Sequence, residues 1–168
     1  MSISIYEVCV PPMIHMLDSL SKILDKAVEQ AKERDIPLSA LLEARLAPDM
    51  HPLTRQIQIA SDAAKGCAAR LTGIEAPSFA DTEASFPELQ ARIAKTIAFL
   101  KSVKPEQFEG GETRQVTLKL PQRTLEFTGL DFLRQVAQPN FYFHVTTAYA
   151  LLRHNGIQIG KADYLGGV

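Results

Sequence analysis

The sequence predicts one mainly α domain of the all-α class over residues 1–168, an up-and-down four-helix bundle with a small β-hairpin inserted before its last helices. Three observations predict this class. Apolar residues recur at alternating steps of four and three positions through several long segments. Prolines and glycines separate those segments by short links, and between residues 106 and 128 the apolar period shortens to two. A chain of 168 residues is also long enough to bury one substantial core.

The first long helix is expected to open at Pro11-Pro12, because the first turn of a helix needs no backbone N–H donors. A single apolar stripe follows these prolines, and charged residues occupy the opposite face. A short helix over residues 38–46 follows the break at Ile36-Pro37. The stripe of the first helix consists of Met13, Leu17, Leu20, Leu24, Ala27 and Ala31.

The second long helix is expected to begin near Leu53, after two prolines, and to end at Gly73, a residue suited to a helix C-terminus. It is rich in Ala and Gly, so a neighbouring helix can approach it closely. Asp81 or Thr82 is expected to cap a third long helix, which Pro105 closes. The stripes are Leu53, Ile57, Ala60, Ala64, Cys67 and Leu71 in the second helix, and Leu89, Ile93, Ile97, Leu100 and Val103 in the third.

The period-two alternation predicts strands over 116–120 and 124–127, joined at Pro121-Gln122 and lying against the helices. A short helix over 129–137 and a final long helix from Pro139-Asn140 to about His154 follow. The tail 157–168 is expected to be irregular and to pack back onto the bundle. Within it, Lys161 and Asp163 could form an ion pair or meet a ligand, and structural docking is the favoured interpretation.

Composition narrows the function classes. The net charge is −1 with scattered positive residues, which argues against a nucleic-acid partner. The sequence contains no run of about 18 apolar residues, so no membrane span is expected. Residues 1–10 lack the features of a signal peptide. We therefore expect a cytoplasmic protein. Cys9 and Cys67 lack metal-site spacing and are expected to be two buried small hydrophobes, although a disulfide is conceivable.

Two histidines are the candidate chemical groups. His144 shares a helix face with apolar residues and should point at or near the core, and His51 lies at the entrance of the second long helix. Two neutral imidazoles could hold one divalent metal, zinc, nickel or iron, with water or a carboxylate completing the shell. The favoured alternative is a partly buried His144 held by one hydrogen bond, with His51 helping to start a helix. His15 and His154 are expected to be surface or structural residues.

A small-molecule pocket between helices is a further possibility, because the last long helix is rich in aromatic residues. The alternative is that these rings form core and dimer interface. The candidate pocket residues are Phe141, Thr147, Tyr149, Lys161 and Asp163.

The C-terminal stretch from Pro139 to Gly156, followed by Gly-Lys-Ala-Asp-Tyr-Leu-Gly at 160–166, resembles the bacterial domain-of-unknown-function family nineteen-ninety-three, and the resemblance spans nearly the whole chain. That family is similar to the DinB/YfiT-like superfamily. The resemblance implies a bundle of four main helices, a frequent homodimer, and in many members a divalent metal on three histidines. Members of known activity include metal-dependent thiol transferases that use mycothiol or bacillithiol.

Carried over by position, the resemblance assigns the first metal ligand to His51 and the last to His144. The middle ligand falls on Asn140, whose amide oxygen is a weaker ligand than imidazole for zinc-class metals. Two hypotheses follow. The favoured one is a non-catalytic small-molecule binder or interaction module with an incomplete metal site. The alternative is a metal-dependent enzyme of the thiol-transferase or hydrolase type that uses His51, Asn140 and His144.

Overall fold

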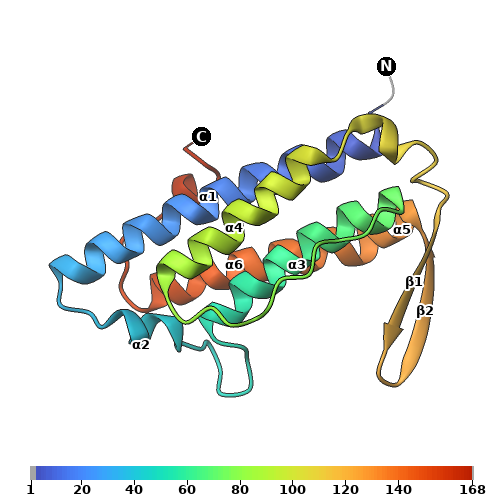
Figure 1. The fold of residues 1–168 in the computed structure, drawn as a ribbon. Coiled ribbons are helices and arrows are strands. Elements are labelled where there is room, and N and C mark those ends of the chain that lie inside the picture. The colour runs from blue at the N-terminus through green and yellow to red at the C-terminus, as the bar shows by residue number, and fades with distance from the viewer. Residues whose placement is uncertain (1–2, 168) are drawn as a thin grey trace.

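The computed structural model describes residues 3–167. Within that range four long helices lie side by side (Figure 1): α1 (Ile5–Glu33), α3 (Leu53–Thr72), α4 (Phe86–Ser102) and α6 (Gln138–His154). Helix α3 packs against α4 and α6, and α1 packs against α4, α6 and α3. Their apolar stripes meet in one buried core. The predicted mainly helical class is confirmed, and so is the small hairpin.

Helix α1 begins earlier than predicted, and Pro11 and Pro12 lie inside it. A capping box starts the helix: the Ser4 hydroxyl accepts from the Glu7 N–H, and the Glu7 carboxylate accepts from the Ser4 N–H at 2.8 Å. Pro12 cannot donate to the carbonyl of Val8. The side-chain amide of Gln138 donates to that carbonyl at 2.8 Å instead. A residue from α6 therefore supplies the hydrogen bond that Pro12 removes.

Helix α2 (Leu38–Leu42) is shorter than predicted, whereas α3 has the predicted bounds and ends at Gly73 in the left-handed region, with φ of 80°. The predicted cap of α4 is wrong. Ser85 caps this helix by accepting from the Glu88 N–H at 3.4 Å. Asp81 and Thr82 lie instead in the extended segment 74–85 between α3 and α4. Asp81 forms ion pairs there with Arg55 of α3 and Arg92 of α4.

The short 3₁₀ helix η1 (Pro105–Phe108) leads to the hairpin, whose strands β1 (Gln115–Leu120) and β2 (Arg123–Thr128) are antiparallel with Val116 opposite Phe127. The hairpin lies beside the end of the helices near α5 (Figure 1). Val116 is buried, and Leu118 and Phe127 are partly buried against the core. Leu120, next to the turn, is 44% exposed, so the base of the hairpin packs while its tip projects.

Helix α5 (Gly129–Phe132), the π-helical segment η2 (Leu133–Ala137) and α6 follow one another without a break. Helix α6 begins one residue before the predicted start at Pro139-Asn140 and ends at His154 as predicted, but no break separates it from the short helical segments before it. Pro139 has no N–H to offer the preceding turn, and its ring crowds the carbonyl four residues back. A wider π turn immediately before α6 accommodates this proline.

The tail packs onto the helices as predicted, with Ile157 and Ile159 buried. It is not irregular throughout, because Lys161–Tyr164 form a short helix, α7, which packs against α1. Of the alternatives left open for Asp163, the structure supports the favoured one, structural docking: its carboxylate pairs with Lys26 of α1 at 2.5 Å and not with Lys161. Val168, the last tail residue, and residues 1 and 2 of the N-terminal segment lie outside the described residues.

Cys9 and Cys67 are buried free thiols, as expected, with their sulfur atoms 3.2 Å apart between α1 and α3. The contact with Cys9, together with burial, raises the pKa of the Cys67 thiol well above its usual range. Among the described helices, none has both the length and the apolar character that a membrane crossing requires.

Candidate functional site

His144 lies on the face of α6 that packs against α3, and it is only 8% exposed. Its Nδ1 atom is 2.6 Å from the side-chain oxygen of Gln56. The amide nitrogen of Gln56 donates in turn to the main-chain carbonyl of His51 at 2.9 Å. This second bond fixes which end of the amide faces the ring, so Nδ1–H is the donor. The neutral tautomer of His144 therefore keeps a free lone pair on Nε2.

The environment of His144 lowers the pKa of its imidazole from 6.5 to about 4. Burial is the largest cause, and the electrostatic effects of the neighbouring His51 and Arg55 side chains add to it. The ring is therefore uncharged at neutral pH. An uncharged ring suits both a metal ligand and a buried structural histidine.

Gln56, near the N-terminal end of α3, links the two positions, because its side chain contacts the ring of His144 and the main-chain carbonyl of His51. The side chain of His51 is exposed in the loop before that helix. Asn140 is also exposed, one helical turn before His144 on α6, and it lines a pocket together with Ile59 and Ala63 of α3. The three predicted ligand positions thus comprise one buried imidazole, one exposed imidazole and one exposed amide.

This donor set does not match a three-histidine metal centre. Across residues 3–167, no group of three or more His, Cys, Asp or Glu side chains is placed to hold a metal ion. An asparagine oxygen adds little affinity for zinc-class ions. The residues at positions 51, 140 and 144 therefore fit a resident metal poorly.

The residues of the predicted ligand pocket have other contacts. The ring of Phe141 is fully buried in the core, and Thr147 donates its hydroxyl to the Phe143 carbonyl at 2.7 Å. Tyr149 packs edge-on against Tyr164 of α7 with 5.8 Å between ring centroids. Asp163 pairs with Lys26, as described above, and Lys161 is exposed. Four of the five side chains thus hold the core or dock the tail.

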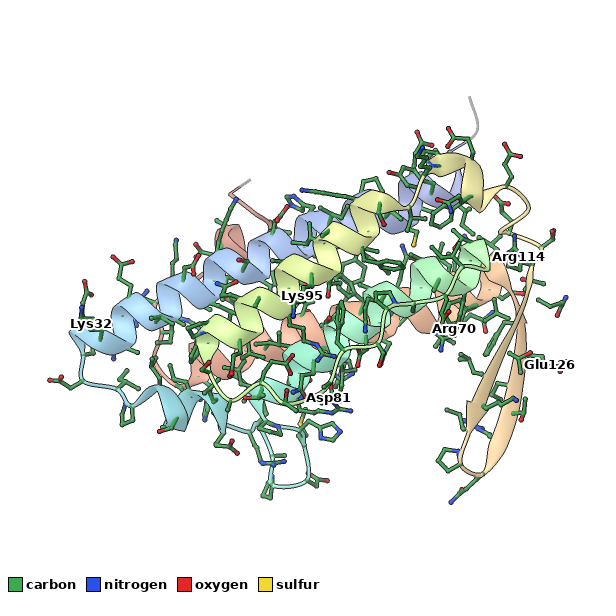
Figure 2. The ribbon with its side chains drawn as sticks, in the orientation of Figure 1. Lys32, Arg70, Asp81, Lys95, Arg114 and Glu126 are labelled. Atoms are coloured by element: carbon green, nitrogen blue, oxygen red, sulfur yellow. The ribbon has the colours of Figure 1, made fainter. Side chains whose placement is uncertain are left out.

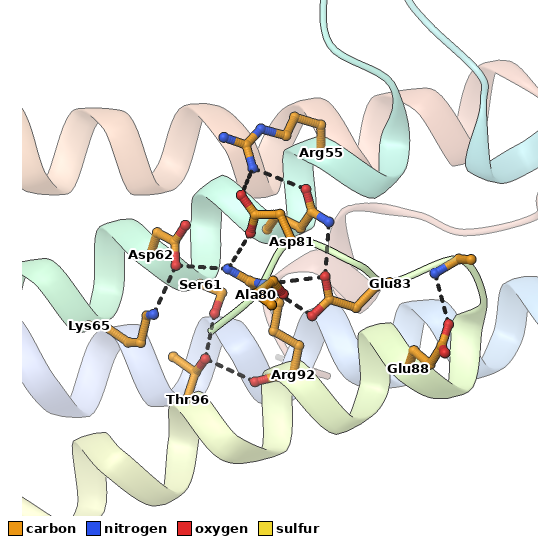
Figure 3. A network of polar contacts seen from close by, with 12 residues as sticks. Arg55, Ser61, Asp62, Lys65, Ala80, Asp81, Glu83, Glu88, Arg92 and Thr96 are labelled. Carbon is orange, nitrogen blue, oxygen red and sulfur yellow. Dashed lines mark hydrogen bonds and ion pairs between the residues drawn. The ribbon is translucent and has the colours of Figure 1, made fainter. Parts of the chain in front are cut away.

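Sequence reasoning missed a network centred on Arg92 of α4, which is 2% exposed (Figure 3). Its guanidinium donates to Asp62 at 2.8 Å, to Glu83 at 3.0 Å and to the Ala80 carbonyl at 3.1 Å, and it lies 3.0 Å from Asp81. The signal was present: Arg92 lies three positions after Leu89 and one before Ile93, on the buried face of its helix. A charged residue at such a position requires partners.

The network holds the segment 74–85 across α3 and α4. Lys65 of α3 donates to the Pro77 carbonyl at 2.9 Å and stands 3.9 Å above the ring of Phe79. Arg55 of α3 pairs with Asp81 at the other end of the segment (Figure 3). The three carboxylates face three cations, so the charges balance within the network.

The comparisons with known proteins agree with this architecture. The chain is similar to a DinB family member protein from Shewanella denitrificans, whose crystal structure superimposes with a TM-score of 0.89 at 40% sequence identity, over 97% of this chain and 92% of that chain. The fold is thus DinB-like. The family described as Domain of unknown function (DUF1993) matches residues 5–165, and the chain belongs to that family. Among curated proteins, none matches the chain.

Proposed function

We propose that this DUF1993 protein is a non-catalytic small-molecule binder, built on an up-and-down DinB-like bundle whose metal site is incomplete. One observation carries the proposal: position 140 holds an exposed asparagine that faces a pocket with Ile59 and Ala63, where a third imidazole would complete the set. Two imidazoles alone fall short of the three or four protein ligands that zinc sites use. The chain thus has the DinB-like fold and the buried His144, but fewer imidazole ligands than a zinc site uses.

The proposal predicts that Asn140→His restores metal binding. Residues at i and i+4 lie on one face of a helix, so a histidine at 140 would stand beside His144. We expect the affinity for Zn²⁺, measured by titration calorimetry at pH 7.5, to rise at least about 100-fold over the wild type. The double variant Asn140→His with His144→Ala is the matched control and should return to the wild-type value. A wild-type protein that already binds one equivalent of zinc as tightly as the variant would overturn the proposal.

A specific contact favours a second candidate, a metal-dependent enzyme of the thiol-transferase or hydrolase type. Histidines that bind metals usually donate their other ring N–H to an oxygen acceptor, and Gln56 gives His144 such an acceptor at 2.6 Å. In that case His51, Asn140 and His144 would hold one divalent ion, which would act as a Lewis acid. Tight zinc binding by the wild type, abolished in His144→Ala, would favour this candidate over the first.

A further inference from the structure

A pocket of about 250 Å³ lies between α3, the hairpin and the continuous run from α5 to α6. Its wall is mainly apolar, and its polar side chains are Asp62, Arg70 and Asn140. Ligand pockets in proteins have this composition, with few polar groups placed to orient the ligand. The apolar residues that line it are Ile59, Ala63, Leu118, Phe132, Val136 and Ala137.

Arg70 provides a positive charge in this pocket that no carboxylate neutralises within the described part of the chain. Its guanidinium carbon lies 5.8 Å from the centroid of the Phe132 ring. Asp62, the acidic residue of the pocket, is already paired with Lys65 at 3.0 Å and with Arg92 at 2.8 Å. The free charge of the pocket is therefore positive, which selects for an anion.

Gly66 permits this position of Arg70. A Cβ atom at residue 66 would lie 2.3 Å from Nη1 of Arg70 and touch no other residue closely, so the guanidinium occupies the space of the missing side chain. Arg70 is thereby folded back along α3 toward Gly66, and it lines the pocket together with Leu118 of the hairpin, close to which it lies in Figure 2. Glycine inside a helix is less favourable than alanine. Alanine at position 66 would favour the helix, but its methyl group would displace the guanidinium of Arg70.

The π-helical turn supplies another wall of the same pocket. Val136 and Ala137 belong to η2, and both line the pocket. Single π turns inside helices are frequent at functional sites, because they displace backbone and side chains from the regular helical path. The unpaired cation and the widened turn are independent features, and they meet at one pocket.

We propose that this pocket binds a small amphipathic carboxylate, with the carboxylate on the Arg70 guanidinium and the apolar body against Phe132, Ala63 and Ile59. The planar guanidinium matches a carboxylate with two parallel hydrogen bonds. From the level of Gly66 to that of Ile59 the helix rises by about 10 Å, a length that a medium-chain acyl group spans. Asn140 stands at the rim. This inference rests on the proposed binding function and names its ligand class.

The test is a titration of the purified wild-type protein with octanoate, octylamine, octanol and acetate, followed by calorimetry and by NMR. Octanoate should bind with a dissociation constant below about 1 mM. Acetate lacks the apolar body and octylamine has the wrong charge, so both should bind at least about tenfold more weakly. Octanol should bind more weakly than octanoate, because it cannot pair with Arg70. Equal or tighter binding of octylamine would overturn the proposal, as would failure of octanoate to bind at about 10 mM.

Two variants assign the site. Arg70→Gln should weaken octanoate binding about tenfold or more, whereas Arg123→Gln, an exposed arginine on the hairpin, should leave it unchanged. Gly66→Ala should also weaken binding while raising the melting temperature, because alanine favours the helix but displaces the guanidinium. Unchanged affinity in both Arg70→Gln and Gly66→Ala would overturn the assignment. If octanoate does not bind to this pocket, the outcome of the metal titration of Asn140→His is unaffected. The two proposals can therefore be rejected independently.

Discussion

Arg92→Met is expected to lower the free energy of unfolding by about 2–4 kcal/mol. Methionine keeps much of the apolar stem but removes the charge that Asp62, Asp81 and Glu83 share. The Glu83 side chain is only 12% exposed, so its carboxylate would be left buried without a charge partner. The side chains of Asp62 and Asp81 are 42% and 39% exposed, so water can solvate their carboxylates instead. This partial rehydration places the expected loss below that of a fully buried pair.

Urea denaturation of the wild type and of Arg92→Met measures this loss. Lys95→Met on the same helix is the control, because residue 95 is exposed, and its effect should stay within about 0.5 kcal/mol. Adding Glu83→Gln to Arg92→Met should recover part of the loss, since it removes the most buried unpaired charge. A loss below about 1 kcal/mol in Arg92→Met would show that Arg92 does not hold the segment 74–85 in place.

Lowering the pH from 6.5 to 4 is expected to destabilise the protein through His144, by up to about 3 kcal/mol. The pKa of this imidazole is about 4 in the folded chain and has its ordinary value of 6.5 in the unfolded chain. Between these values the unfolded chain binds the proton that the folded chain excludes, so acid favours unfolding. The stabilisation is complete above pH 6.5 and is lost as the pH falls through about 4.

The measurement is the free energy of unfolding at several pH values in wild type and in His144→Gln. The variant should show a flatter profile between pH 4 and 6.5, whatever its stability at neutral pH. His154→Gln, at an exposed position of the same helix, should keep the wild-type slope. Asp81 and Glu83 also make the protein acid-sensitive, because burial raises their pKa values less than their hydrogen bonds and the nearby arginines lower them. This effect acts at lower pH than the effect of His144. An identical slope in wild type and His144→Gln would contradict this account of the buried histidine.

The helical stripes made most of the fold predictable, because the period of apolar residues is a local property of the chain. The errors occur where a distant residue decides the outcome. Pro12 lies inside α1 because Gln138 supplies the hydrogen bond that the proline removes. Asp81 leaves the helix start because Arg92 and Arg55 pair with it. Neither partner is visible in the local sequence.

The candidate site was predictable in the same partial way. The apolar face of α6 placed His144 inward, and its burial agrees. The hydrogen bond to Gln56 could not be inferred, since it depends on how α3 and α6 align. The pocket around Arg70 could not be predicted from the sequence either, because it forms only where the hairpin, the π turn and the missing side chain of Gly66 come together. Asn140 belongs to both descriptions, as a weak metal ligand in sequence and as a pocket residue in space.

We propose that this chain keeps a DinB-like fold without a resident metal, and elemental analysis of wild-type protein purified without added chelator tests this proposal most directly. We expect less than about one-tenth of a zinc, nickel or iron ion per chain, and near-stoichiometric metal in Asn140→His prepared in parallel. About one ion per wild-type chain, lost in His144→Ala, would contradict the claim and assign His144 to a working metal centre.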